Sequence, residues 1–141
     1  MTAYCAVQDL IDRHGDDELL LLADRNRDGE MDADVLDQAI ADAADEIDAY
    51  VAARYPLPLA TVPGVLLRVA CDIVVYRLAV TADLETEERR KRYDDAVKFL
   101  TALSRGDTAL GIPSPPSTVS NQVHSSGNPR IMTRSSLKGV L

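Results

Sequence analysis

The sequence predicts an all-α fold, a small bundle of about five helices (two short, three longer) followed by an extended C-terminal arm. Apolar residues recur at three- and four-residue intervals through most of residues 6–105, which is the spacing of one helix face. Glycine or proline follows three of these segments. Residues 112–141 lose the spacing and are rich in Ser, Pro, Asn and Gly. We therefore predict a helical domain over residues 1–111 and an extended or flexible arm over residues 112–141.

Two short helices are expected first. Residues 6–14 place apolar side chains on one helix face, and Gly15 follows as a stop. The three carboxylates of residues 16–18 then favour the start of a second helix, because a helix N-terminus attracts negative charge. We expect this helix to end near Asp24.

A long amphipathic helix is expected over residues 33–54, with aspartates on the side away from its apolar face. Pro56 and Pro58 should end it, because proline lacks a backbone donor and forces the preceding residue into extended geometry. The segment RYPLPLATVP, residues 54–63, is predicted to be a stiff connector between two helices, and its proline-containing part at residues 54–58 is not expected to be a peptide ligand for another domain.

The most apolar helix is expected from Pro63 to about Thr81, at the centre of the bundle. It is long enough to span a membrane, but Arg68, Asp72 and Arg77 interrupt it, and each charge would cost roughly 2.5–3.5 kcal/mol in a bilayer. We therefore predict a core helix and no membrane contact. Asp72 could pair with Arg68 one turn earlier or with Arg77.

Thr86 is placed to cap the last helix and Gly106 to end it. Its inner face should carry Tyr93, Val97, Leu100 and either Leu103 or Ser104. Three ion pairs spaced four residues apart are expected on its outer side: Glu87/Lys91, Glu88/Arg92 and Asp94/Lys98.

Charge is unevenly distributed. The net charge is -8, but residues 1–111 hold all 23 acidic residues against 12 Lys and Arg, whereas the arm holds three basic residues and no acid. An acidic body should repel nucleic acid, which disfavours a DNA-binding regulator. Cys5 and Cys71 show no metal-ligand spacing and are expected to be buried free thiols of a cytosolic protein without a signal segment.

Residues 24–32, DRNRDGEMD, begin like the calcium loop of an EF-hand. The template requires a glutamate six residues after Gly29, and Val35 stands there. A turn at Asp28 and Gly29 with Asp32 as a helix cap is the favoured interpretation, so no metal site is predicted. A small calcium-binding or regulatory helical interaction module remains the alternative function.

No catalytic group or cofactor site is predicted. His14 ends a helix, His124 lies in the arm, and no serine has a nearby base or the glycines of a nucleophile elbow. The protein is therefore not expected to be an enzyme.

Several strings resemble the small Mu-like phage and prophage family of head-to-tail connector (neck, head-completion) proteins, in order over about residues 4–111. They are DLIDRHG at 9–15, IDAYVAARYPLPL at 47–59, ACDIVVYRL at 70–78 and RYDDAVKFL at 92–100. The resemblance implies a virion neck protein, assembled in the host cytoplasm, that forms a ring of usually twelve copies beneath the portal. Its partners would be the portal protein, neighbouring copies and a tail-completion or tail terminator protein, with DNA passing through without specific binding.

The resemblance carries over no catalytic residues. The matched residues are expected to be architectural: Arg54, Tyr55, Leu57 and Pro58 would set the angle between two helices, and Arg68 with Asp72 would balance charge on an apolar one. The arm combines basic and isolated apolar residues that could order on the portal or a neighbour. The expected contact residues are Arg130, Ile131, Met132, Arg134, Leu137 and Lys138.

Overall fold

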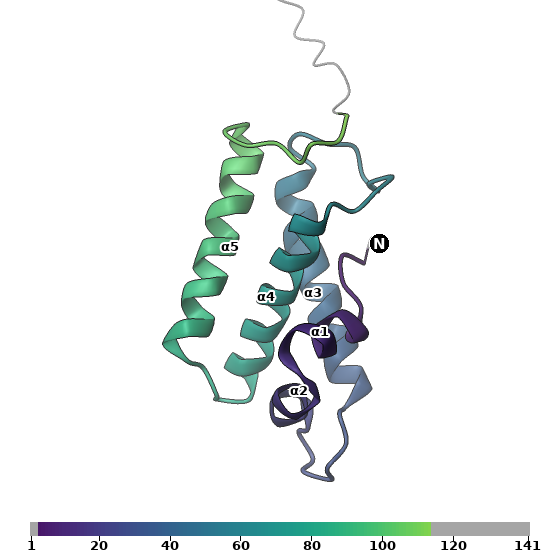
Figure 1. The fold of residues 1–141 in the computed structure, drawn as a ribbon, viewed down its shortest axis with the longest axis vertical. Helices are drawn as coiled ribbons and strands as arrows, with labels where there is room; N and C mark the ends of the chain where they lie inside the picture. Colours follow the sequence, from purple (N-terminus) through teal and green to yellow (C-terminus); the bar gives the residue numbers. More distant parts are fainter. Residues whose placement is uncertain (1–2, 114–141) are drawn as a thin grey trace, which may run out of the picture.

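The computed structural model describes residues 3–113, and within that range it contains five helices and no strand. The predicted all-α fold is confirmed (Figure 1). The helices are α1 (Val7–His14), α2 (Asp16–Ala23), α3 (Ala33–Val51), α4 (Gly64–Thr81) and α5 (Glu87–Arg105). Among the described residues, none of these helices is both long enough and apolar enough to cross a membrane.

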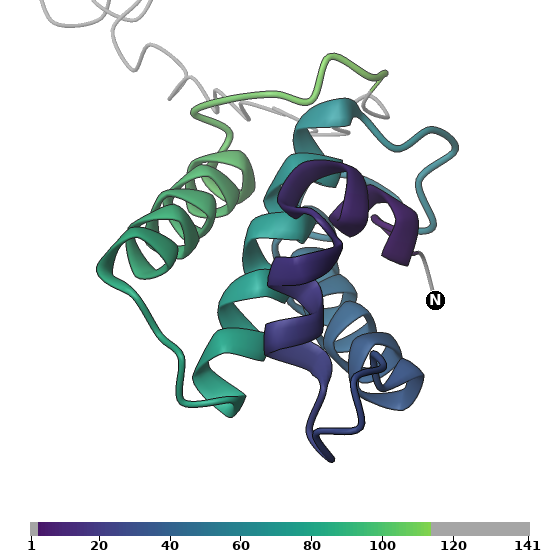
Figure 2. The same cartoon turned by 60° about the horizontal axis from the view of Figure 1, so that its bottom comes forward.

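The three long helices form the main body, and α4 is its centre (Figure 1). Nine residues of α4 are buried, more than on any other helix. The helix packs against α3, α5 and α2, while α1 and α2 lie on one side of it (Figure 2). The prediction of a central core helix is therefore confirmed.

Three of the predicted helix boundaries are held by the expected residues. Gly15 and Gly106 have φ angles of 86° and 84°, a region that favours glycine, where α1 and α5 end. Thr86 caps α5, since its hydroxyl accepts a hydrogen bond of 3.2 Å from the backbone nitrogen of Arg89.

Helix α3 ends at Val51, three residues before the predicted end. Its last turn tightens, because the nitrogens of Ala53 and Arg54 bond to carbonyls three residues back, at 3.4 and 3.0 Å. At the other end Asp32 occupies the cap position without capping. Its carboxylate instead accepts the backbone N–H of Arg25 at 2.9 Å, so this side chain holds the preceding loop.

Two details of α5 differ from the prediction. Glu88 and Arg92 pair at 2.5 Å, but Lys98 pairs with Asp95 at 3.6 Å, three residues away rather than four. The buried face is formed by Ala96, Leu100 and Leu103. Val97 and Ser104 are half-buried, and so is Tyr93, which packs against the core.

Cys5 and Cys71 are free, buried and next to each other, although 66 residues separate them in the chain. The hydrogen bond with the Cys71 thiol, together with burial, raises the pKa of Cys5. The thiol of Cys5 is therefore protonated at neutral pH. The prediction of buried free thiols is confirmed, and the fold adds that they are neighbours.

Candidate interaction surfaces

A groove of about 450 Å³ opens between α1, α4 and α5. We call it the basic groove and define it by its polar lining: Arg13, His14, Arg68 and Arg92, together with the carboxylates of Asp72 and Asp95, which offset part of their charge. Its apolar lining is Val69, Ala96 and Phe99. The groove thus combines three arginines and two aspartates with an apolar lining, on a body that is otherwise strongly acidic.

Asp72 also lines the basic groove and is half-buried. Desolvation raises the pKa of this carboxyl, and the positive charges of Arg92, His14, Arg68 and Arg13 act in the opposite direction without cancelling the shift. The structure does not form the expected ion pairs, since within the described residues Asp72 has no salt bridge to Arg68 or Arg77. Arg68 affects the pKa of Asp72 only through the electrostatic attraction between its guanidinium and the carboxylate.

Arg77 instead joins α4 to α3. Its guanidinium bonds to the carboxylate of Glu46 at 2.7 Å, and the hydroxyl of Tyr93 on α5 donates to the other oxygen of Glu46 at 2.9 Å. The ring of Tyr93 stacks on that of Tyr76, with 4.3 Å between centroids. Burial, followed by the contact with Glu46, raises the pKa of Tyr93 to about 12. One carboxylate therefore connects all three long helices.

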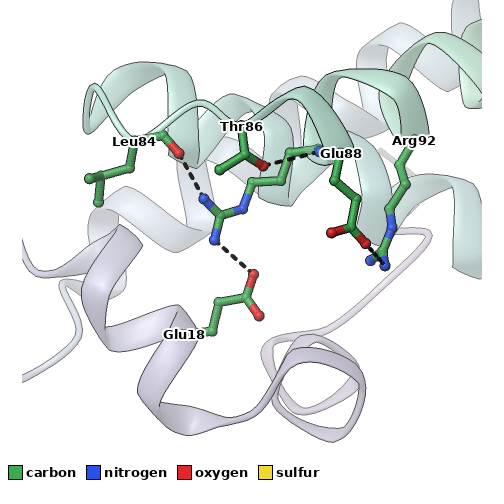
Figure 3. Close-up of polar contacts among 6 residues, drawn as sticks. Glu18, Leu84, Thr86, Glu88 and Arg92 are labelled. Atoms are coloured by element: carbon green, nitrogen blue, oxygen red, sulfur yellow. Dashed lines mark hydrogen bonds and ion pairs between the residues drawn. The ribbon is translucent and has the colours of Figure 1, made fainter.

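A second polar cluster connects α2 to the start of α5 (Figure 3). The guanidinium of Arg89 donates to the carboxylate of Glu18 at 3.0 Å and to the carbonyl of Leu84 at 2.7 Å. Figure 3 also shows Glu88 and Arg92 paired on the adjacent turn. Arg89 therefore fixes α2, the α4–α5 loop and α5 to one another.

Of the four residues predicted to be architectural in the α3–α4 connector, Arg54 and Tyr55 contact the segment where the chain leaves α5. The guanidinium of Arg54 lies against Gly106, so close that a Cβ there would stand 2.1 Å from its Nη1. Tyr55 is buried, and its hydroxyl accepts the backbone N–H of Leu110 at 3.1 Å. Leu57 packs against the core, whereas Pro58, which follows it through a cis peptide bond, is exposed.

An apolar hollow of about 290 Å³ lies beside this connector, and we call it the exit hollow. Its lining includes Pro58 and Leu59 from the connector, and Ile112 and Pro113 from the segment after α5. Ile112 also packs against the core. The body therefore holds the chain at least as far as Ile112, while the six arm residues predicted to contact a partner lie outside the described residues, as does His124.

The loop at residues 24–32 folds as a turn. Backbone nitrogens of Asp28 and Gly29 bond to the Asp24 carboxylate at 3.2 and 3.0 Å, and Glu30 bonds to Asp28 at 2.8 Å. Gly29 has a φ of 89°. Among residues 3–113, no group of His, Cys, Asp and Glu side chains is arranged to hold a metal ion.

The chain matches a family model, "Bacteriophage Mu, Gp36", over residues 4–127, and it therefore belongs to that family of Mu-like phage proteins. It is 37% identical over 112 residues to "Gene product J" of Escherichia phage Mu, covering 79% of this chain and 78% of the relative. It is 36% identical over 92 residues to "Mu-like prophage FluMu protein gp36" of Haemophilus influenzae, covering 65% of this chain and 64% of the relative.

The residues that the sequence prediction missed are those that join helices distant in the chain. Glu46 and Arg77 are 31 residues apart, and Glu18 and Arg89 are 71 apart. A local pattern cannot reveal such pairs, because each residue alone looks like one more charge on a solvated helix face.

Proposed function

We propose that this Mu-like phage protein is a head-to-tail connector subunit of the virion neck. Copies of the chain form a ring beneath the portal, link the filled capsid to the tail, and leave a channel for DNA. The portal protein, neighbouring copies and a tail-completion or tail terminator protein are the partners. Membership of the Mu-like phage family supports a place in the phage particle. The acidic body and the anchored exit of the C-terminal arm support the connector role.

The distribution of charge carries the proposal. The body has a net charge of -11 over residues 1–111, and α3 alone holds six acidic residues and no Lys or Arg. A wall of this kind repels the phosphate backbone, so DNA can move along it without being held. A basic wall would retain the same DNA.

The anchored exit of the chain supports an adaptor with an arm. Leu110 is buried and bonded to Tyr55, and Ile112 packs against the core, so the following residues start from a fixed point on the body. Residues 112–141 carry a net charge of +3 and scattered apolar side chains. In the proposal this arm orders on the portal or on a neighbouring copy.

The test compares the full chain with a version that ends at Pro113, which keeps Ile112 on the body. Light scattering measures the mass of each chain alone and after mixing with portal rings of the same phage. A full chain that joins the portal rings, and a shortened chain that does not, would support the adaptor with its arm. A full chain that leaves the mass of the portal rings unchanged would remove the connector proposal.

A matched pair of variants separates the loss of the arm's apolar contacts from the effect of adding negative charge to the arm. Ile131→Asp with Met132→Asp should weaken portal binding, because the charges would have to be buried in the contact. Ser135→Asp with Ser136→Asp adds the same charge at polar positions and should have a smaller effect. Equal losses in both variants would show that arm charge, not apolar contact, decides binding.

A further inference from the structure

We propose that the basic groove binds the acidic outer face of α3 from a second copy of this chain. The inference rests on the proposed ring-forming function and names the two surfaces that meet between neighbours. One copy supplies the groove formed by α1, α4 and α5, and the next copy supplies the helix.

Two arginines of the groove form no direct polar contact within the described residues, although their positive charges act on Asp72. Arg13 and Arg68 are exposed, and neither forms an ion pair or a side-chain hydrogen bond within residues 3–113. Among residues 3–113 the ion-pair partner of Arg92 is Glu88, and both side chains are more than half exposed, so water weakens that pair. Guanidinium groups form two parallel hydrogen bonds with a carboxylate, which suits an acidic partner.

The floor of the groove indicates a protein partner. Val69, Ala96 and the half-buried Phe99 give it an apolar lining beneath the arginines. Protein interfaces commonly have such an apolar centre with a polar rim, in which Arg and aromatic residues are enriched. A free inorganic anion would leave this lining uncovered.

Helix α3 offers the complementary surface. Asp34, Asp37 and Asp45 are exposed, and at 100° per residue they fall within about 80° of one another around the helix axis. The stripe from Asp34 to Asp45 is about 16 Å long. Of the six acidic residues of α3, these three face solvent most fully, and no Lys or Arg of the same helix neutralises them.

The two surfaces can be used at the same time. No residue of α3 lines the basic groove, so a copy that receives a neighbour's helix still offers its own. A contact between two different patches is heterologous, and repeated copies close into a ring when the rotation permits. Duplex DNA is a poorer occupant, because the net charge of -11 on the body repels it before the groove is reached.

The test is a charge-reversal exchange on the full chain. The groove variant carries Arg13→Glu and Arg68→Glu, and the helix variant carries Asp37→Lys and Asp45→Lys. Sedimentation velocity over a concentration series at low salt measures self-association, and circular dichroism checks that each variant is folded. Each variant alone should associate at least about tenfold more weakly than the parent chain, because like charges then face each other.

Mixing the two variants should restore association. The acidic groove of one variant then meets the basic helix of the other, and the unchanged surfaces still fit. The matched controls are Arg105→Glu and Asp107→Lys, which reverse exposed charges at and just after the end of α5 and should leave association unchanged.

A parent chain that stays monomeric at every concentration would overturn the inference, and so would association that survives both reversals or a mixture that fails to recover. Groove-dependent binding of duplex DNA in place of self-association would overturn it as well. Portal binding, measured in parallel by light scattering, separates the two proposals. A parent chain that joins portal rings without any dependence on the groove refutes the inference alone, whereas failure to join the portal refutes the connector role alone.

Discussion

Gly106 shows how one residue ends the helical body. Its φ of 84° lies in the left-handed region, where a side chain costs about 1–2 kcal/mol, and Arg54 fills the space that a Cβ would enter. We expect Gly106→Ala to lower the free energy of unfolding by at least about 1 kcal/mol. Urea denaturation of the full chain measures the change.

Gly64→Ala is the matched control for this substitution. Gly64 opens α4, and a Cβ there would have no atom within 4 Å. Alanine in a helix is favoured over glycine by roughly 0.5–1 kcal/mol, so the control should be neutral or stabilising. Equal losses at both sites would show that the φ angle of Gly106 does not limit stability.

Asp72 predicts a dependence of stability on pH. Because its folded pKa is raised, the folded protein holds the proton more tightly than the unfolded chain does. The contribution of this carboxyl to the free energy of unfolding is complete when the pH is below 3.8, its ordinary pKa, and is lost as the pH rises through the folded pKa. Asp72→Asn should therefore gain stability relative to the parent chain as the pH rises toward 7.

Urea unfolding of both proteins at several pH values measures this difference, with Asp94→Asn as the control at an exposed carboxylate. A difference for Asp72→Asn that stays constant with pH, or that reverses in sign, would contradict the prediction. In that case the surrounding arginines would outweigh the desolvation of the carboxyl.

At the scale of elements, α5 and α2 are attached through Arg89. The side chain is only 18% exposed and bonds both Glu18 and the carbonyl of Leu84. Arg89→Met keeps the apolar stem and removes these bonds, and we expect it to cost about 1–2 kcal/mol of unfolding free energy. Arg90→Met removes a 3.9 Å pair whose arginine is 67% exposed, so it should change stability by less than about 0.5 kcal/mol.

Chemical denaturation of the two variants measures both effects. Similar losses for Arg89→Met and Arg90→Met would mean that the connection between α2 and α5 contributes no more than a surface ion pair. Faster hydrogen exchange of α2 amides in Arg89→Met alone would locate the loss at the predicted attachment.

The sequence predicted the helices well because their signals are local. Gly15, Thr86 and Gly106 act through their own backbone or the adjacent turn, and each stands where the structure needs it. The predicted end of α3 lies three residues beyond the observed one. The apolar spacing continues past Val51 into residues whose backbone forms hydrogen bonds three residues back instead of four. The periodicity of side chains does not distinguish a regular helix from its tightened last turn.

The candidate surfaces were less predictable, because they depend on residues brought together from different helices. Arg68 and Asp72 have the spacing of an ion pair, yet each faces the groove among charges from α1 and α5. The sequence offers Arg77 as another partner for Asp72, but in the structure Arg77 bonds Glu46 on α3. Local spacing cannot choose among such partners, since the choice is made by packing.

At the scale of the whole molecule, the central position of α4 separates two kinds of surface. Its nine buried apolar residues lie at the middle of the core, and apart from Arg68, Asp72 and Arg77 the charges of the body are carried by the surrounding helices and loops. Helix α3 is acidic throughout, whereas α5 holds six of the 12 basic residues of the body. A subunit with unlike charge on different sides is suited to heterologous contacts, while its net acidity repels DNA.

The boundary between body and arm can be tested on the same scale. A chain that ends at Pro113 keeps Leu110, which is 8% exposed, together with its bond to the Tyr55 hydroxyl and the packing of Ile112. We expect it to unfold with the same free energy as the full chain. A chain that ends at Ala109 loses a buried leucine and leaves the Tyr55 hydroxyl without the backbone N–H that it binds, which should cost about 2–4 kcal/mol.

Urea denaturation of the three chains measures the difference, and the slope of the transition reports how much surface each one exposes on unfolding. If the Pro113 chain were as unstable as the Ala109 chain, residues beyond 113 would have to contribute to the body. Equal stability of the full and Pro113 chains, with a large loss at Ala109, would place the end of the folded unit at the α3–α4 connector and leave the following residues free to bind a partner.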